Sequence, residues 1–288
     1  MGFILAFLTA VSESTKDYFS KKALTGDIDE YTSSFALRFF ALPVLLVILF
    51  FTGIPEIAPK FWIALFVSGG LNVFATILFM KSIQNSDLSL VIPMINFTPL
   101  FLLLTSPIIV GEFPDIYGLI GILLIVVGTY VLNLQEKDKG ILAPIKAIFK
   151  KKGPRLMLGV AFIWSITSNF DKWGVEGSSS YFWVFASTVF ISFFLFFIML
   201  KFSEDSIDTI KKNAKALVPI GAVNSLKITF QMVALNFTLV PYVISIKRTS
   251  ILWSMIIGFI FFKERKEIKQ RLLGGVLMIA GVIFITLL

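Results

Sequence analysis

The chain has 288 residues, of which 57% are hydrophobic and only 15% are charged, and its mean hydropathy is +0.88. Soluble domains are about 45–50% apolar and about 25% charged, so this composition excludes an ordinary soluble protein. The absence of cysteine and histidine excludes disulfides, thiolate catalysis and imidazole metal sites. No acidic cluster suggests a metal site, so we expect neither metal nor cofactor, and we interpret the net charge of +8 relative to a membrane and not to nucleic acid.

Ten apolar stretches follow one another along the chain, each near the roughly 20 residues that a helix needs to cross a bilayer. We therefore predict an all-α, polytopic membrane protein with ten transmembrane helices. Most connections between the stretches are short. The predicted helices cover residues 2–24, 31–52, 61–80, 88–110, 115–134, 155–175, 180–201, 213–235, 239–262 and 268–288.

The one long connection, residues 135–154, is rich in lysine. Its isoleucines, leucine and phenylalanine alternate with Lys146 and Lys150–Lys152. Such a segment is typical of a basic amphipathic stretch that lies on an anionic membrane surface, but a plain solvated linker fits equally well. In either case it divides the chain into a first unit, 1–134, and a second unit, 155–288.

The two units resemble each other in sequence. Residues 68–112 align with 220–264 without a gap, so that Asn72 matches Asn224 and Glu112 matches Glu264. Phe19 and Lys21 likewise match Phe170 and Lys172, and Gly121 and Gly128 match Gly274 and Gly281. Because each unit has five helices, an odd number, the second must cross the membrane in the opposite sense to the first. The sequence therefore predicts two inverted repeats, an arrangement found in alternating-access transporters. We expect the repeated glycines to be packing positions.

The basic residues outside the predicted helix centres gather on the odd-numbered connections. Lys60 is the single base on an even-numbered connection. The positive-inside rule predicts that the odd-numbered connections, with 135–154, are cytoplasmic and that both termini lie outside a cell (inner) membrane. The 19 bases on the odd side are Lys21, Lys22, Lys81, Lys137, Lys139, Lys146, Lys150, Lys151, Lys152, Arg155, Lys201, Lys211, Lys212, Lys215, Lys263, Arg265, Lys266, Lys269 and Arg271.

Several charges fall deep inside predicted spans, where each costs about 2.5–3.5 kcal/mol on insertion scales. Charges at this depth face an aqueous cavity or each other and mark a functional site. The deep bases outnumber the deep acids, which favours an anionic ligand. The deep groups are Lys16, Arg38, Lys227, Lys247 and Arg248 among the bases, and Glu13 and Asp17 among the acids. We interpret Asp171 and Lys172 as a pair near a helix end that reaches the interface.

Glu13, Lys16, Asp17 and Lys21 are spaced three or four residues apart on one helix face. They form either a self-neutralising ladder or a coupling site in which Glu13 binds and releases a proton.

Polar residues form stripes on two pairs of matching spans. Asn224, Lys227 and Gln231 share a face, and Asn72 occupies the corresponding place in the first unit. Asn96 stands where the second unit has Arg248. We predict that Lys247, Arg248, Lys227, Arg38, Asn224, Asn72 and Asn96 bind substrate, since a lysine beside an arginine suits phosphate or carboxylate.

The segments PMINFTPLFLLLTSPIIVGE, followed by GLIGILLIVVG, and SILWSMIIGFIFFKE, followed by LLGGVLMIAG, resemble the EamA-type members of the drug/metabolite transporter superfamily. The resemblance covers essentially the whole chain and implies a central cavity lined by spans 1, 3, 4, 6, 8 and 9, with spans 5 and 10 behind. The Lys247–Arg248 pair is similar to the pair that binds phosphate in organic-phosphate translocators. The resemblance also implies cytoplasmic termini, which conflicts with the charge distribution.

We therefore expect a secondary active transporter of a small anionic or zwitterionic metabolite, with organic phosphates among the candidates. A proton-coupled exporter of amino acids or amphiphilic drugs, or a lipid flippase, is the alternative. An intramembrane enzyme is a remote one, because no Ser–Lys or paired-aspartate motif is present. The expected partners are a small-molecule substrate and the bilayer, and either a monomer or a homodimer is compatible with the sequence.

Overall fold

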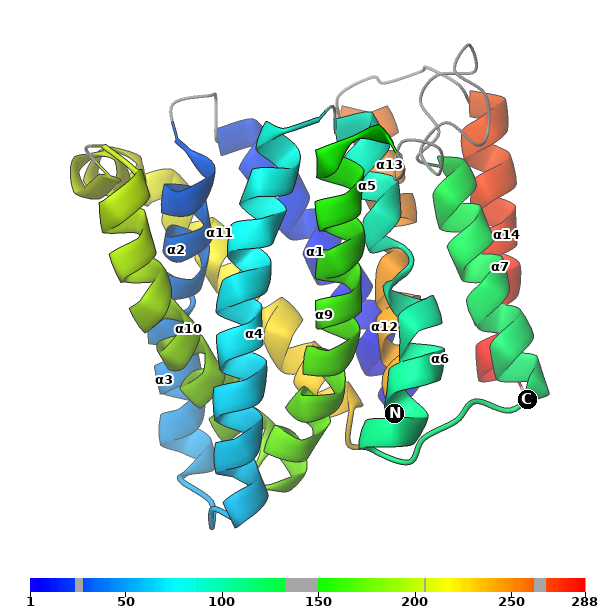
Figure 1. Cartoon of the computed structure of the whole chain (residues 1–288), viewed down its shortest axis with the longest axis horizontal. Coiled ribbons are helices and arrows are strands. Elements are labelled where there is room, and N and C mark those ends of the chain that lie inside the picture. The colour runs from blue at the N-terminus through cyan, green and yellow to red at the C-terminus, as the bar shows by residue number, and fades with distance from the viewer. Residues whose placement is uncertain (24–27, 87, 133–149, 205, 262–267, 288) are drawn as a thin grey trace.

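The computed structural model describes the whole chain except residues 24–27, 87, 133–149, 205, 262–267 and 288 (Figure 1). The described residues form helices and their connections, which confirms the predicted all-α class. The helices are α1 (Gly2–Ala23), α2 (Glu30–Phe39), α3 (Leu42–Thr52), α4 (Pro59–Gln84), α5 (Leu88–Ile95), α6 (Thr98–Ile109), α7 (Ile116–Leu132), α9 (Lys152–Glu176), α10 (Ser180–Phe202), α11 (Ser206–Ala234), α12 (Val240–Arg248), α13 (Ser250–Phe261) and α14 (Ile268–Thr286).

The helices of the described residues correspond to the ten predicted spans, because three spans are each divided into two helices: α2–α3, α5–α6 and α12–α13. Five described helices or helix pairs are long and apolar enough to cross a membrane by length and composition: Glu30–Thr52, Pro59–Gln84, Leu90–Ile109, Ser180–Phe202 and Ser206–Ala234. Charged second halves keep α1 and α9 out of this group. Most of the predicted basic segment 135–154 lies outside the described residues, and its last residues already belong to α9.

The breaks in the two matching spans fall at the same place in the repeat. The first separates α5 from α6 at Asn96 and Phe97, between Pro93 and Pro99. The second separates α12 from α13 at Thr249, the repeat counterpart of Phe97. Proline removes a backbone donor and disfavours helix before it, which explains the first break but not the second. Both breaks interrupt the helix near mid-span, and their backbone N–H groups bond to carbonyls three residues earlier. An interrupted helix at membrane depth is tolerated where it is buried in protein or lines a cavity.

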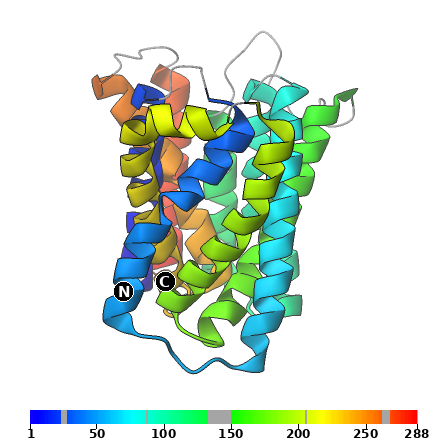
Figure 2. The ribbon, with the colours of Figure 1, turned by 90° about the vertical axis from the view of Figure 1, so that its left-hand side faces the viewer.

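Both chain termini lie at the same end of the helix bundle (Figure 1). We call this the terminal end, and we call the opposite end, where α7 ends and α9 begins, the linker end. Every complete span runs from one end to the other, so the chain crosses the bundle ten times. In Figure 2, the first turns of α11 lie across the linker end before the helix turns down into the bundle.

Two groups of helices face each other across the molecule. In the α9 bundle, helices α4, α5 and α6 pack on α9, and in the α1 bundle, α11, α12 and α13 pack on α1. Each bundle takes its central helix from one unit and its other helices from the other unit. The two bundles are therefore counterparts under the repeat.

The remaining pair, α7 and α14, packs tightly through the four repeated glycines. A Cβ atom on Gly121 would lie 2.6 Å from the carbonyl oxygen of Gly281, and one on Gly128 would lie 2.7 Å from that of Gly274. The first glycine of α7 thus meets the second glycine of α14, and the second meets the first. This crossed pairing requires antiparallel helices, so the two units are inverted relative to each other, as predicted.

Candidate substrate cavity

A cavity of about 530 Å³ lies between the α1 and α9 bundles. This volume is within the range of about 300–1,000 Å³ that small-molecule sites occupy. Its wall contains every site residue that the sequence singled out: Glu13, Lys16, Asp17, Arg38, Asn72, Asn96, Asn224, Lys227, Lys247 and Arg248. Helices α2 and α10 also contribute residues, whereas α7 and α14 contribute none among the described residues.

Glu13 lies at the centre of a network of charges that joins the two units. Its Oε1 accepts a hydrogen bond of 2.5 Å from Lys16 Nζ on the same helix, and its Oε2 lies 3.2 Å from Lys227 Nζ on α11. The second contact is an ion pair whose angles fall short of a hydrogen bond, since Oε2 has no hydrogen-bond partner among the described residues. Asp17 Oδ1 lies 3.3 Å from Lys16 Nζ. Glu13, Lys16 and Asp17 of the predicted ladder on α1 are therefore paired, and the network also reaches across to the other unit, whereas the side chain of Lys21 lies outside the described residues.

The two bases at the α12–α13 break differ in their partners. Lys247 Nζ donates to Gln231 Oε1 on α11 at 2.9 Å. Arg248 Nη2 donates to Thr98 Oγ1 at 3.1 Å, and its guanidinium carbon lies 6.0 Å from the ring centroid of Trp164. Arg248 Nε is buried without a hydrogen-bond partner in the described part of the chain. Thr98 and Trp164 therefore hold the guanidinium of Arg248 in place, while its Nε–H donor has no partner among the described residues.

The three predicted asparagines are distributed around the same wall. Asn72 Nδ2 donates to the carbonyl oxygen of Ser68 at 2.9 Å, and Asn224 Nδ2 donates to that of Leu37 at 3.3 Å. Asn96 is 2% exposed, and its Nδ2 finds no partner within the described ranges. A buried amide donor without a partner costs free energy, so a ligand acceptor at this point would be stabilising.

The structure corrects the interpretation of Asp171. This residue lines the cavity, and its Oδ1 accepts a hydrogen bond of 2.6 Å from Ser68 Oγ on α4. Its neighbour Lys172 points elsewhere and pairs with Glu112. The position of the aspartate near the end of a span suggested the interface, but the bond from Ser68 on the neighbouring α4 holds the carboxylate in the cavity wall. The cavity wall thus carries five bases and three acids.

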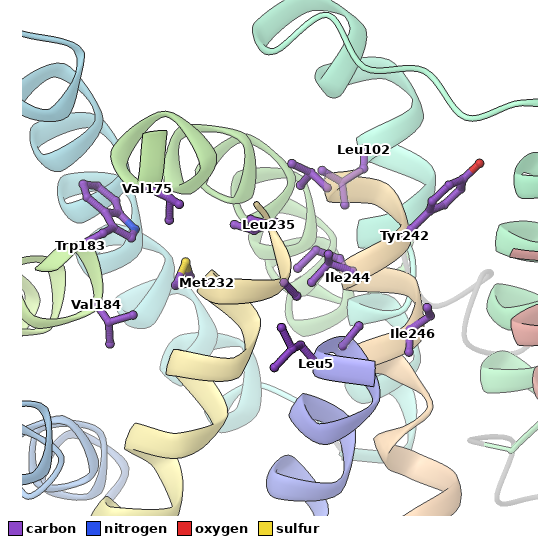
Figure 3. Packing of buried hydrophobic residues seen from close by; sticks show 14 of the residues in the cluster. Leu5, Leu102, Val175, Trp183, Val184, Met232, Leu235, Tyr242, Ile244 and Ile246 are labelled. Carbon is purple, nitrogen blue, oxygen red and sulfur yellow. The ribbon is translucent and has the colours of Figure 1, made fainter. Parts of the chain in front are cut away.

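An apolar cluster packs beside the cavity, among residues from the parts of the helices near the terminal end. It contains Leu5, Phe61, Val175, Trp183, Val184, Met232, Leu235 and Ile244, which come from both units and are at most 9% exposed. Figure 3 labels all of these side chains except Phe61, and they come from α1, α9, α10, α11, α12 and the turn after α11. We call this cluster the apolar plug. Val184 lies one helical turn from the cavity residues Ser187 and Thr188, so the plug begins directly beside the cavity.

The comparisons with known proteins agree with this architecture. The model of the EamA-like transporter family matches residues 1–134 and 151–287. A solved crystal structure of another protein has a TM-score of 0.78 and 13% identity, covering 99% of this chain and 96% of its own, which shows a shared fold. A search of curated proteins gives no match. The chain therefore belongs to the EamA-like transporter family, and it is a membrane transporter of the drug/metabolite type.

Proposed function

We propose that the protein is a secondary active transporter that carries a small anionic or zwitterionic metabolite by alternating access. The observation that supports this most directly is the polar cavity between two inverted units, with two more bases than acids in its wall. An inverted repeat offers two related conformations, each open at one end. The apolar plug suits a conformation in which the terminal end is closed.

The binding site proper is proposed to lie at the two helix breaks. Arg248 and Asn96 occupy counterpart positions there, and both carry buried nitrogen donors without a partner among the described residues. Together with Lys247 they would hold a carboxylate or phosphate group, because a guanidinium fork and an ammonium complement such oxygens. Organic phosphates are candidates on this ground. Asp171 would suit a positively charged group at the other side of a zwitterion.

The substrate class can be tested by thermal unfolding of the purified protein with organic phosphates, carboxylates, amino acids and organic cations. A ligand at about 100 times its Kd stabilises the folded state by about 2.7 kcal/mol. We expect stabilisation by at least one anionic or zwitterionic class. Stabilisation by cations alone would contradict the proposal.

A second candidate is proton-coupled export of amino acids or amphiphilic compounds, or movement of a phosphate-headed lipid. The contact of Glu13 with lysines from both units favours it, because a change of charge at this carboxylate would alter the ion pairing between α1 of the first unit and α11 of the second. Under this proposal Glu13→Gln transports without pH dependence. A Glu13→Gln variant that keeps the pH dependence of the unchanged protein would exclude the role.

We also propose that the linker end faces the cytoplasm. Exposed lysines near this end include Lys81, Lys211, Lys212 and Lys215, whereas Lys60 at the terminal end is paired with Glu176 at 2.9 Å. Because the chain has no cysteine, a single Lys212→Cys variant reports the orientation directly. We expect an impermeant maleimide to label it only from the cytoplasmic side, and labelling of intact cells would reverse the assignment.

A further inference from the structure

The terminal end holds a partly buried carboxylate that does not line the substrate cavity. Glu112 follows α6, after a turn in which Gly111 has a φ of +74°. One of its oxygens pairs with Lys172 Nζ on α9, and the two side chains are only 11% and 16% exposed. Its other oxygen, Oε2, accepts a hydrogen bond of 2.7 Å from the backbone N–H of Val240 on α12. The carboxylate thus joins three helices.

These contacts belong to different bundles. Asn169 on α9 is fully buried and bonds to both Thr105 and Ser106 on α6, at 3.1 and 2.7 Å. Helices α6 and α9 are therefore fastened together, and the Lys172–Glu112 pair lies within the α9 bundle. The bond to Val240 instead crosses to the α1 bundle. The ion pair with Lys172 orients the carboxylate, and Glu112 Oε2 makes the hydrogen bond that joins the α9 bundle to the α1 bundle.

The N-terminus of α12 needs such a partner. Val240 is the first residue of the helix, and its N–H has no intrahelical acceptor. The next residue, Pro241, has no N–H, so Glu112 satisfies the first free donor that the helix presents. A carboxylate at a helix N-terminus is also favoured by the helix dipole. The bond is charge-assisted, which makes it stronger than one between neutral groups.

The two partners of Glu112, Lys172 and Val240, each lie on a helix that also carries a cavity residue. Lys172 directly follows Asp171, and Val240 lies two helical turns before Lys247 on the same helix. A ligand that draws Asp171 and Lys247 together or apart therefore acts on the helices that Glu112 joins. We propose that Glu112 is a latch that keeps the terminal end of the cavity closed, with Lys172 as its positioning residue. This inference rests on the alternating access of the proposed function.

The latch can be tested without a substrate, so failure of the test is distinct from failure of the proposed function. Since the natural chain has no cysteine, a Val184→Cys reporter in the apolar plug is the only thiol present. Val184 is fully buried in the closed form. Opening of the terminal end would expose it to a water-soluble maleimide, so the labelling rate reports the open population.

We expect Glu112→Met, which removes both bonds, to raise the labelling rate of Val184→Cys about tenfold. Glu112→Gln keeps an acceptor and should give a smaller rise. The matched control is Lys60→Met, which breaks the exposed Lys60–Glu176 pair at the same end and should leave the rate unchanged. An Ile125→Cys reporter, buried between α7 and α14, should remain unlabelled in every variant.

The charge-swapped variant Glu112→Lys with Lys172→Glu separates a latch from a plain ion pair. The swap restores the opposite charges, but a lysine at position 112 cannot accept from the Val240 N–H. We therefore expect the swapped variant to label as fast as Glu112→Met. The proposal is overturned if the swap restores slow labelling, if Glu112→Met leaves the rate unchanged, or if Val184→Cys and Ile125→Cys become reactive together.

Discussion

The two units present matching positions to the cavity but fill them with different side chains. On α1, Glu13, Lys16 and Asp17 line the wall, and their repeat counterparts on α9 are Trp164, Thr167 and Ser168, which also line it. In the broken spans the contrast is reversed. There the second unit carries Lys247 and Arg248, where the first carries Ile95 and Asn96.

This contrast separates what the repeat preserves from what it leaves free. The breaks at Asn96 and Thr249, the crossed glycines and the places that face the cavity are shared by both units, whereas the break between α2 and α3 has no counterpart in α10. The charges are not shared: six of the eight charged residues in the wall lie on α1, α11 and α12, which all belong to the α1 bundle, and the other two are Arg38 on α2 and Asp171 on α9. Symmetry of the backbone thus supplies two conformations of related geometry, whereas asymmetry of the side chains supplies a site with a preferred ligand charge.

The largest effect is expected from making the second unit resemble the first. Arg248→Asn places at the second break the residue that the first break already has. It removes the guanidinium that donates to Thr98 and faces the cavity. We expect the affinity for the stabilising anion to fall about 100-fold, or about 2.7 kcal/mol.

Titration of ligand-induced thermal stabilisation measures this loss. Arg248→Lys is the graded variant, because it keeps the charge but loses the fork, and it should retain part of the affinity. Lys201→Gln, which removes an exposed lysine 5.6 Å from the ring of Phe202, should bind as the unchanged protein does. Unaltered affinity in Arg248→Asn would mean that the charge asymmetry has no role in binding.

A smaller effect is expected where the units are alike. Gly281→Ala adds a Cβ atom 2.6 Å from the carbonyl oxygen of Gly121, so α7 and α14 must separate. Overpacking of this kind costs about 1–3 kcal/mol. Gly70→Ala is the matched control, since its Cβ would have no neighbour within 4 Å and helix propensity favours alanine. Thermal unfolding in detergent should show loss of stability only in Gly281→Ala, and equal stability of the two variants would contradict the close packing.

The smallest effect concerns the starts of two counterpart helices. Asp29 caps α2 by accepting from the N–H groups of Tyr31 and Thr32, and Ser179 caps α10 by accepting from that of Phe182. Replacing either with alanine should cost about 1 kcal/mol at neutral pH. Only the aspartate titrates, so the two variants should differ in acid.

Burial raises the pKa of Asp29, but hydrogen bonds from Ser203 and Thr32 outweigh it and lower the pKa below its usual value. A lowered pKa contributes stability above the unfolded-state pKa of about 3.9, and that stability is lost as the pH falls through the folded-state pKa. The cost of Asp29→Ala should therefore shrink in unfolding experiments carried to about pH 3. The cost of Ser179→Ala should stay the same at this pH. If both costs shrink equally, the lowered pKa of Asp29 does not contribute to the stability of the α2 cap.

Much of the fold could be predicted because a bilayer imposes a simple rule on sequence. Apolar length located the ten spans, depth within a span located the seven charged cavity residues, and polar stripes located the three asparagines. The break at Asn96 had a visible cause in Pro93 and Pro99. The break at Thr249 had none in its own unit, and only its counterpart in the first unit could have indicated it.

The remaining features depend on contacts between distant segments. Asp171 lies near the end of its span in the sequence, but Ser68 on α4 holds it inside the cavity. Glu112 was noticed only as a repeated residue, because nothing in the sequence says that Lys172 and the N–H of Val240 meet it from two other helices. Such relations arise from packing and cannot be read from the pattern of one chain.

The crossed glycines of α7 and α14 also relate the two units by symmetry. In a symmetric dimer, residue i of one copy meets residue j of the other, and j meets i. Gly121 with Gly281 and Gly128 with Gly274 follow this rule, if each unit is counted as a copy. The surface between α7 and α14 is thus the interface that two separate five-helix polypeptides would form when inserted in opposite orientations. The contact between α7 and α14 therefore has the geometry of a symmetric dimer interface inside a single chain.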